Sequence, residues 1–100
     1  MPRGYWIASI DVNDPDAYKA YVTANAAAFR KYGAKFMVRG GRFELREGTS
    51  RSRNVVLEFD DYATALACYD SPEYRAASAL RQGNSTANLV IIEGYDGDQP

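Results

Sequence analysis

The sequence predicts an α+β fold of the ferredoxin-like type, with a four-stranded antiparallel sheet and helices on one face. Hydrophobic residues alternate in four separate stretches, as is typical of strands. Segments whose hydrophobic residues have helical spacing follow the first and third of these stretches. The 100 residues, 46% of them hydrophobic, contain no internal repeat or linker. We therefore expect one domain over residues 1–100, with its core at about 4–95 and a tail at 96–100.

The first strand and the first helix have clear boundaries. Gly4–Val12 alternates and is rich in aromatic and branched residues. Asp14 is the expected N-cap of the helix, and Pro15 suits its first position. The helical pattern runs to about Tyr32, where Gly33 can supply a left-handed C-cap.

The middle of the chain predicts two more strands joined through a hairpin. Ala34–Arg39 alternates, and Gly40-Gly41 then indicates a bulge or a tight bend. Arg42–Glu47 resumes the alternation as a short, charged edge strand. A polar loop at 48–52 leads into Asn54–Phe59, the third main strand.

The last third predicts two helical segments and a closing strand. Asp60-Asp61 offers two N-caps for a helix with Tyr69 on its inner side. Ser71-Pro72 then starts a second short helix, roughly Pro72–Gln82, at a new angle. Ala87–Tyr95 is the expected last strand.

Composition excludes several classes of function. Twelve Lys and Arg against thirteen Asp and Glu give a net charge of −1, which argues against a dedicated nucleic-acid binder. No apolar run approaches the ~20 residues that cross a bilayer. The N-terminal residues lack the features of a signal peptide, so a cytoplasmic location is the default expectation. A single cysteine and no histidine exclude an internal disulfide and a Cys/His metal site.

The sheet is expected to leave one apolar face without helices. The more apolar set of each strand is assigned to the helices: Trp6, Ala8, Ile10, Phe36, Val38, Val55, Leu57, Phe59, Val90 and Ile92. The opposite set then faces away from them: Tyr5, Ile7, Ser9, Met37, Arg39, Val56, Glu58, Leu89, Ile91 and Glu93. Its apolar centre favours a homodimer in which two sheets face each other and close a barrel. The alternative is that the strand phases slip by one residue and this face is partly solvated.

The combined pattern resembles one known family. The segments are GYWIA with the following DP and Y, RGGRFELREG, RNVVLEFDDYATALACYDSPEY, and the closing VIIEGY. Together they are similar to the domain of unknown function 1330 family, within the dimeric α/β-barrel superfamily. The resemblance covers roughly residues 4–95 and implies a ferredoxin-like protomer and a homodimer. The superfamily includes cofactor-free monooxygenases, isomerase-like enzymes, haem-dependent members and ligand-sensing domains, so it leaves the reaction open.

Aromatic and amide side chains indicate a cavity on the helix side of the sheet. Asn25 falls on the apolar stripe of the first helix, where its amide must find a partner or face a cavity. With Trp6, Tyr69 and Tyr74 it could surround a small ligand, because these rings combine apolar walls with polar tips. The alternative is a tyrosine-rich core without a ligand.

Arginines indicate an anion site. Six of the twelve Lys and Arg lie between Lys35 and Arg53. Arg39 comes just before two glycines whose backbone N–H groups could help to bind the anion. Arg81 could turn inward from the end of the last helix and supply a second guanidinium. Such a site would suit a small carboxylate. The alternative is a solvated hairpin, with Arg39 paired to Glu58 or Glu93 across the sheet.

These residues lead to two hypotheses of function. In the first, the protein is a cofactor-independent enzyme of the monooxygenase or isomerase type that acts on a small anionic or aromatic metabolite. Glu58, which could be paired with Glu93, and Tyr69 are then the catalytic candidates, while Asn25, Arg39, Tyr74 and Arg81 bind the substrate. In the second, the protein is a non-catalytic module that binds or senses a small ligand. A third interpretation is that the polar residues serve assembly only.

Overall fold

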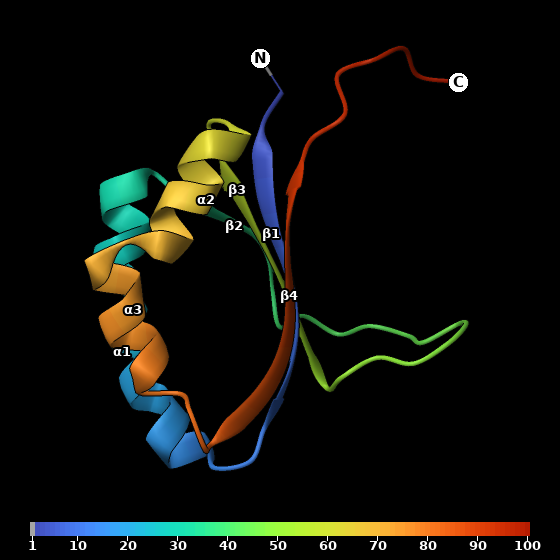
Figure 1. The fold of residues 1–100 in the computed structure, drawn as a ribbon. Helices are drawn as coiled ribbons and strands as arrows, with labels where there is room; N and C mark the ends of the chain where they lie inside the picture. Colours follow the sequence, from blue (N-terminus) through green and yellow to red (C-terminus); the bar gives the residue numbers. More distant parts are fainter. Residues whose placement is uncertain (1) are drawn as a thin grey trace.

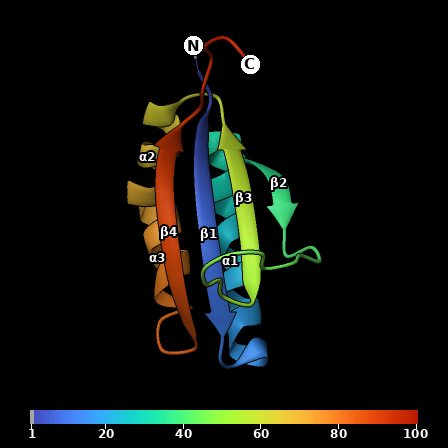
Figure 2. The same cartoon turned by 90° about the vertical axis from the view of Figure 1, so that its right-hand side faces the viewer.

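The computed structural model describes residues 2–100, and Met1 lies outside the described residues. The elements in chain order are β1 (Gly4–Val12), α1 (Pro15–Tyr32), β2 (Lys35–Arg39), β3 (Arg53–Phe59), α2 (Tyr62–Asp70), α3 (Pro72–Ala79) and β4 (Ser85–Glu93). The strands form one antiparallel sheet in the order β2-β3-β1-β4 (Figure 2). All three helices cover one face of it, and we call the other the open face (Figure 1). The predicted ferredoxin-like α+β fold is confirmed.

The caps predicted for α1 are present. The Asp14 carboxylate accepts the backbone N–H of Ala17 at 3.2 Å, and Pro15 follows it as the first helical residue. Gly33 ends the helix with φ 70°, in the left-handed region that favours glycine.

A single serine separates α2 from α3. The N–H of Ser71 donates to the Cys68 carbonyl at the end of α2, and its hydroxyl accepts the N–H of Tyr74 at the start of α3. Helix α3 ends at Ala79 rather than at Gln82, since the next N–H groups bond three residues back, as in a 3₁₀ turn. Arg81 therefore lies in the turn after the helix and not within it.

The predicted edge strand at Arg42–Glu47 is wrong. Residues 40–52 contain no strand and form an arm that leaves the sheet on the side of the open face (Figure 1). The backbone turns at Gly40, which has φ 65° and donates its N–H to the Asn54 carbonyl at 2.9 Å. Beyond that bond the described arm makes no ladder with β3.

A bulge in β2 reverses the faces predicted for its second half. The β2–β3 register shifts between Phe36 and Val38, so Met37 is the extra residue. Phe36 keeps its place on the helix side. Beyond the bulge, however, Arg39 pairs with the buried Val55 and faces the helices, while Val38 faces away from them. The predicted placement of Arg39 on the open face is therefore wrong.

The faces predicted for β4 are also reversed. Its pairing with β1 places Leu89 and Ile91 on the helix side, while Val90 and Ile92 are exposed on the open face. Both alternating sets of this strand are apolar, so alternation alone could not choose between them. Glu93 pairs with a residue of the helix-side set and does not share a face with Glu58.

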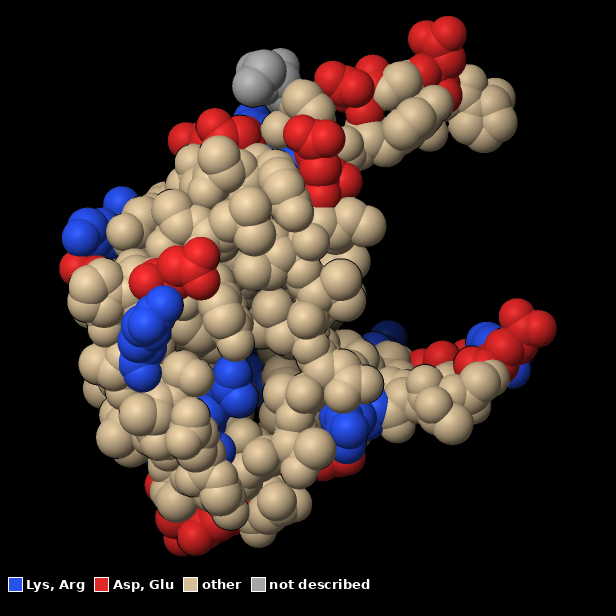
Figure 3. Space-filling view, in the orientation of Figure 1, with Lys and Arg blue, Asp and Glu red and all other residues tan. Residues whose placement is uncertain are grey.

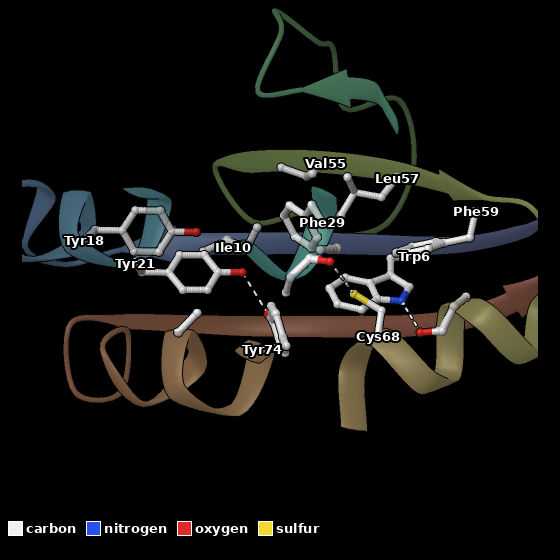
Figure 4. Close-up of a cluster of buried hydrophobic side chains, with 14 residues drawn as sticks. Trp6, Ile10, Tyr18, Tyr21, Phe29, Val55, Leu57, Phe59, Cys68 and Tyr74 are labelled. Carbon is white, nitrogen blue, oxygen red and sulfur yellow. Dashed lines mark hydrogen bonds between the residues drawn. The ribbon is translucent and has the colours of Figure 1, made fainter. Parts of the chain in front are cut away.

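Aromatic rings dominate the core between helices and sheet (Figure 4). Trp6 of β1 is 2% exposed, and its indole N–H donates to the Ala65 carbonyl at 2.9 Å. The rings of Phe29, Phe59, Tyr69 and Tyr74 lie with their centres 4.8 to 5.7 Å from it. None of the described helices is long and apolar enough to cross a membrane.

Candidate functional site

A cavity runs across the sheet beneath the helices, in two adjoining sections. The section on the β2 and β3 side has a volume of about 40 Å³, and the one beside α3 and β4 about 20 Å³. One water needs about 10–15 Å³ on this measure, so together they hold roughly four to six waters. The two sections share five lining residues: Ala8, Ile10, Tyr18, Tyr21 and Leu89.

Helix α1 supplies the roof of the cavity. Tyr18, Tyr21 and Asn25 follow one another at spacings of three and four, so they share one face of the helix. Asn25 is only 6% exposed, and none of residues 2–100 forms a hydrogen bond with its side-chain amide. A buried amide of this kind normally has a partner, so Asn25 is available to a ligand.

Two arginines lie at the β2–β3 end. The bulge directs Arg39 into the cavity, where its guanidinium lies 4.1 Å from the centre of the Phe36 ring. Arg53, at the start of β3, packs its guanidinium over Gly40, where a Cβ would collide with it. The Nε of Arg53 is buried and has no hydrogen-bond partner among the described residues. Such an orphaned donor is rare and indicates a missing acceptor.

A third arginine lies at the opposite end, beside α3 and β4. The guanidinium of Arg81 lies 5.6 Å from the centre of the Tyr21 ring. The Arg81 carbonyl is fixed by the hydroxyl of Ser85, which donates to it at 3.1 Å. Next to it the hydroxyls of Tyr21 and Tyr74 form a hydrogen bond of 2.8 Å, which is drawn as a dashed line in Figure 4. The rings, and no carboxylate, therefore position this guanidinium.

The cavity carries an excess of positive charge. None of the ion pairs found among residues 2–100 involves Arg39, Arg53 or Arg81, and no Asp or Glu lines either section. Figure 3 shows Lys and Arg atoms within a hollow between the helical layer and the sheet. Within the described chain, no group of three or more Asp, Glu or Cys side chains could hold a metal ion. The cationic lining therefore suits an organic anion.

Two buried tyrosines keep their protons at neutral pH. Burial raises the pKa of Tyr18, and the charges of Arg53 and Arg81 only partly oppose this effect. Burial also raises the pKa of Tyr21, and the neighbouring Tyr74 hydroxyl adds to the shift. Both phenols can therefore act as hydrogen-bond donors toward a ligand.

All four residues predicted to bind a substrate line this cavity. Asn25 and Arg39 lie in the larger section, and Tyr74 and Arg81 in the smaller one. The salt bridges considered for Arg39 are absent among the described residues. The bulge explains the missing pair with Glu58, because it places Arg39 on the other side of the sheet from that residue. Glu93 is out of reach for a different reason, since β2 and β4 are the two opposite edges of the sheet.

The two residues predicted to be catalytic lie outside the cavity. Glu58 is on the open face, where its carboxylate accepts the hydroxyl of Tyr5 at 3.0 Å. The Tyr69 ring is 36% exposed and packs 5.3 Å from the centre of the Tyr74 ring at the outer rim of the helices. The sheet separates Glu58 from every arginine of the cavity.

Three polar lining residues were not predicted as site residues from the sequence: Arg53, Tyr18 and Tyr21. Arg53 alternates in phase with Val55 and Leu57, which predicts the helix side, so the pattern could have found it. Tyr18 lies seven residues before Asn25 on the same helical face, and this spacing is also readable from the sequence.

Comparison with known proteins identifies the family and supports the fold. Solved structures with a similar fold include a protein of unknown function from Rhodopseudomonas palustris, at 20% identity and a TM-score of 0.72, over 96% of this chain and 85% of that one. SnoaB from Streptomyces nogalater, a cofactor-independent oxygenase, is similar at 14% identity and a TM-score of 0.62, over 100% and 97% of the two chains. A dimeric protein of unknown function with a ferredoxin-like fold from Bacteroides fragilis is similar at 14% identity and a TM-score of 0.62, over 93% and 97%. No curated protein matches the sequence.

At these identities the structural likeness shows the fold alone. The sequence itself matches the family described as Domain of unknown function (DUF1330) over residues 3–95. The chain belongs to the DUF1330 family.

Proposed function

We propose that this protein binds a small organic anion, with an aromatic or aliphatic body, in the cavity between its helices and its sheet. The observation that carries this proposal is the lining of three guanidinium groups without a carboxylate, one of which has a buried and unpaired Nε. A carboxylate or phenolate would supply the missing acceptor through charge-assisted hydrogen bonds. The buried amide of Asn25 adds a further polar contact, and the apolar floor accommodates the body of the ligand.

The same lining supports a chemical role for the bound anion. Guanidinium groups and protonated tyrosines stabilise an enolate or phenolate as it forms, which favours a cofactor-independent oxygenase or isomerase. SnoaB, an oxygenase of this kind, has a similar fold. Glu58 is not used in this proposal because it lies on the open face. The hydrogen-bonded phenols of Tyr21 and Tyr74 could relay a proton instead.

A non-catalytic binding module is the second candidate. The absence of any Asp, Glu or Cys among the lining residues favours it, since no side chain with an ordinary general-base pKa reaches the cavity. Screening phenolic and carboxylic metabolites for oxygen consumption or isomerisation distinguishes the two. Binding without turnover across the screen would favour the module.

Calorimetric titration with benzoate tests the binding itself, with benzyl alcohol as the neutral analogue. We expect benzoate to bind and benzyl alcohol to bind at least ten times more weakly. Arg53→Met should weaken benzoate about 10- to 100-fold, because it removes a hydrogen bond to a charged group, about 1.5–3 kcal/mol. Arg46→Met is the matched control, since Arg46 lies on the exposed arm and pairs with Glu44. Equal loss in both variants, or equal affinity for both compounds, would contradict the proposal.

We further propose that the protein is a homodimer joined through its open faces. This face exposes a row of large apolar side chains, with Ile7 at 45%, Val38 at 43%, Val90 at 56% and Ile92 at 47%. Patches of this kind are typical of interfaces. The arm at 40–52 and the tail at 94–100 both project on this side, as Figure 1 shows, and could contact a partner. The similar protein from Bacteroides fragilis is dimeric.

Sedimentation at micromolar concentration tests the dimer. We expect a mass near twice 11.1 kDa for the native chain. Val90→Asp should give monomers, because it places a charge in the centre of the apolar row. Thr23→Asp, on the exposed side of α1, is the control and should leave the mass unchanged. A native chain that sediments as a monomer would refute the interface.

A further inference from the structure

We propose that the ligand carries two anionic groups, one at each end of a short apolar body, and lies across the sheet. This inference rests on the proposed binding of an organic anion and narrows its class to dianions. It follows from the distribution of charge along the cavity, because cationic groups line both of its ends and the residues shared by the two sections carry no charge.

The strand order places the two cationic ends on opposite sides of β1. Arg53 belongs to β3, and Arg81 lies beside β4 in the turn after α3. Because β1 lies between β3 and β4, these strands are about 10 Å apart at the usual spacing of about 4.8 Å. Ala8 and Ile10 of β1 form an apolar floor between the two ends. A monoanion would therefore satisfy only one end of the cavity.

The arginines at the two ends are positioned in a similar way. Arg39 stacks on Phe36 at 4.1 Å, and Arg81 lies 5.6 Å from the centre of the Tyr21 ring. Aromatic faces hold a guanidinium in place without occupying its N–H groups. The Tyr74 hydroxyl also interacts with the Arg81 guanidinium, whose five N–H donors leave others available to an anion. Each end also has a neutral polar group, the Asn25 amide at one and the Tyr74 hydroxyl at the other. Both ends are thus equipped to bind a carboxylate.

Tyr18 links the two ends. It lines both sections of the cavity, and the charges of Arg53 and Arg81 both act on its pKa. Its hydroxyl forms no hydrogen bond with any of residues 2–100. The two cationic ends therefore lie close enough to act on one group, and one small molecule can reach both.

The volume limits the length of the ligand. Room for roughly four to six waters corresponds to about 120–180 Å³ of liquid volume, or a molecule of roughly ten non-hydrogen atoms. A linear dicarboxylate of six carbons has this size and separates its charges along its length. Adipate is therefore the probe, and hexanoate is its matched monoanion with the same number of carbons.

Titration calorimetry with adipate and hexanoate tests the inference. We expect the native protein to bind adipate at least ten times more tightly than hexanoate. Arg81→Met should lower this ratio to near one, because it removes the second cationic end. Arg75→Met, on the exposed side of α3, is the control and should keep the ratio of the native protein. Far-ultraviolet circular dichroism of each variant verifies that it is folded, and Arg81→Gln serves as a second variant if Arg81→Met is not.

The results distinguish this inference from the proposed function. If adipate and hexanoate bind the native protein equally, or if Arg81→Met lowers both affinities by the same factor, the dianion is refuted and anion binding stands. If neither of them binds, and benzoate does not bind either, both proposals are refuted. A ratio above ten that falls only in the Arg81 variants supports the dianion.

Discussion

Two arginines only two positions apart should have opposite effects on stability. Arg51 is satisfied, because its guanidinium donates to the Asp11 carboxylate at 3.0 Å and to the Asn88 amide oxygen at 3.2 Å. Arg53 has no carboxylate partner among the described residues, and its Nε is buried without an acceptor. We therefore expect Arg53→Met to stabilise the ligand-free protein and Arg51→Met to destabilise it.

The magnitudes follow from these contacts. An unsatisfied buried polar group costs about 1–3 kcal/mol, and methionine keeps the length and the apolar stem of Arg53. After some loss of packing, Arg53→Met should raise the free energy of unfolding by about 1 kcal/mol. Arg51 and Asp11 have side chains that are 30% and 44% exposed, so solvent weakens their pair. Arg51→Met should therefore lower the free energy of unfolding by about 1 kcal/mol.

Urea and thermal unfolding measure both effects. For a domain of this size, about 1 kcal/mol shifts the melting temperature by about 4–8 °C. Proteins are compared at one concentration, because a dimer gains stability with concentration, and in a buffer free of carboxylates and phosphate, which could occupy the cavity. If Arg53→Met lowers the melting temperature as Arg51→Met does, Arg53 has a partner in the ligand-free protein and the argument for an anion site loses its main support.

Three further predictions concern single groups. Tyr74→Phe should lower the free energy of unfolding by about 1–3 kcal/mol, since it leaves the buried Tyr21 hydroxyl unpaired; a change below about 0.5 kcal/mol in urea unfolding would contradict this. Gly40→Ala should cost about 1 kcal/mol or more because of its φ of 65°, and should weaken benzoate binding by displacing Arg53; unchanged affinity in calorimetry would refute the contact. The N–H of Ser52 and the Arg51 guanidinium lower the pKa of Asp11 in the folded protein. This carboxylate therefore stabilises the fold at any pH above the ordinary Asp pKa, and the stabilisation is lost as the pH falls through the lowered pKa of the folded state. Asp11→Asn should therefore unfold more easily than the native protein at pH 7, and urea midpoints that differ as much at pH 2 would count against it.

The helix boundaries were predictable because capping is a local property. Asp14, Ser71 and Gly33 act through hydrogen bonds or dihedral angles within a few residues of themselves. The end of α3 was predicted three residues too late, since nothing in the sequence at Ala79 requires the tighter turn that follows.

The faces of β2 and β4 could not be read from alternation. In β2 one extra residue, Met37, changes the phase, and a bulge depends on pairing with β3 and not on the residues of β2 alone. In β4 both phases are apolar, because one faces the core and the other the open face. The error at β2 moved Arg39 to the wrong side of the sheet. Only the strand register shows that Arg39 and the other cavity arginines lie on the same side of the sheet.

The separation of Glu58 from the cavity bears on how an ionised ligand could arise there. No carboxylate of residues 2–100 lines the cavity, so a bound phenol or enol would lose its proton to tyrosine or water and not to a carboxylate. A guanidinium ~5 Å from the developing oxyanion stabilises it by roughly 3 kcal/mol at an effective dielectric constant of about 20. Each 1.36 kcal/mol is one pKa unit, so each arginine lowers the pKa of the ligand by roughly two units. Burial opposes this effect, as Tyr18 shows, because its pKa is raised although the charges of Arg53 and Arg81 act to lower it. The lining therefore favours a ligand that enters already ionised, such as a carboxylate, over a phenol that would have to lose its proton inside the cavity.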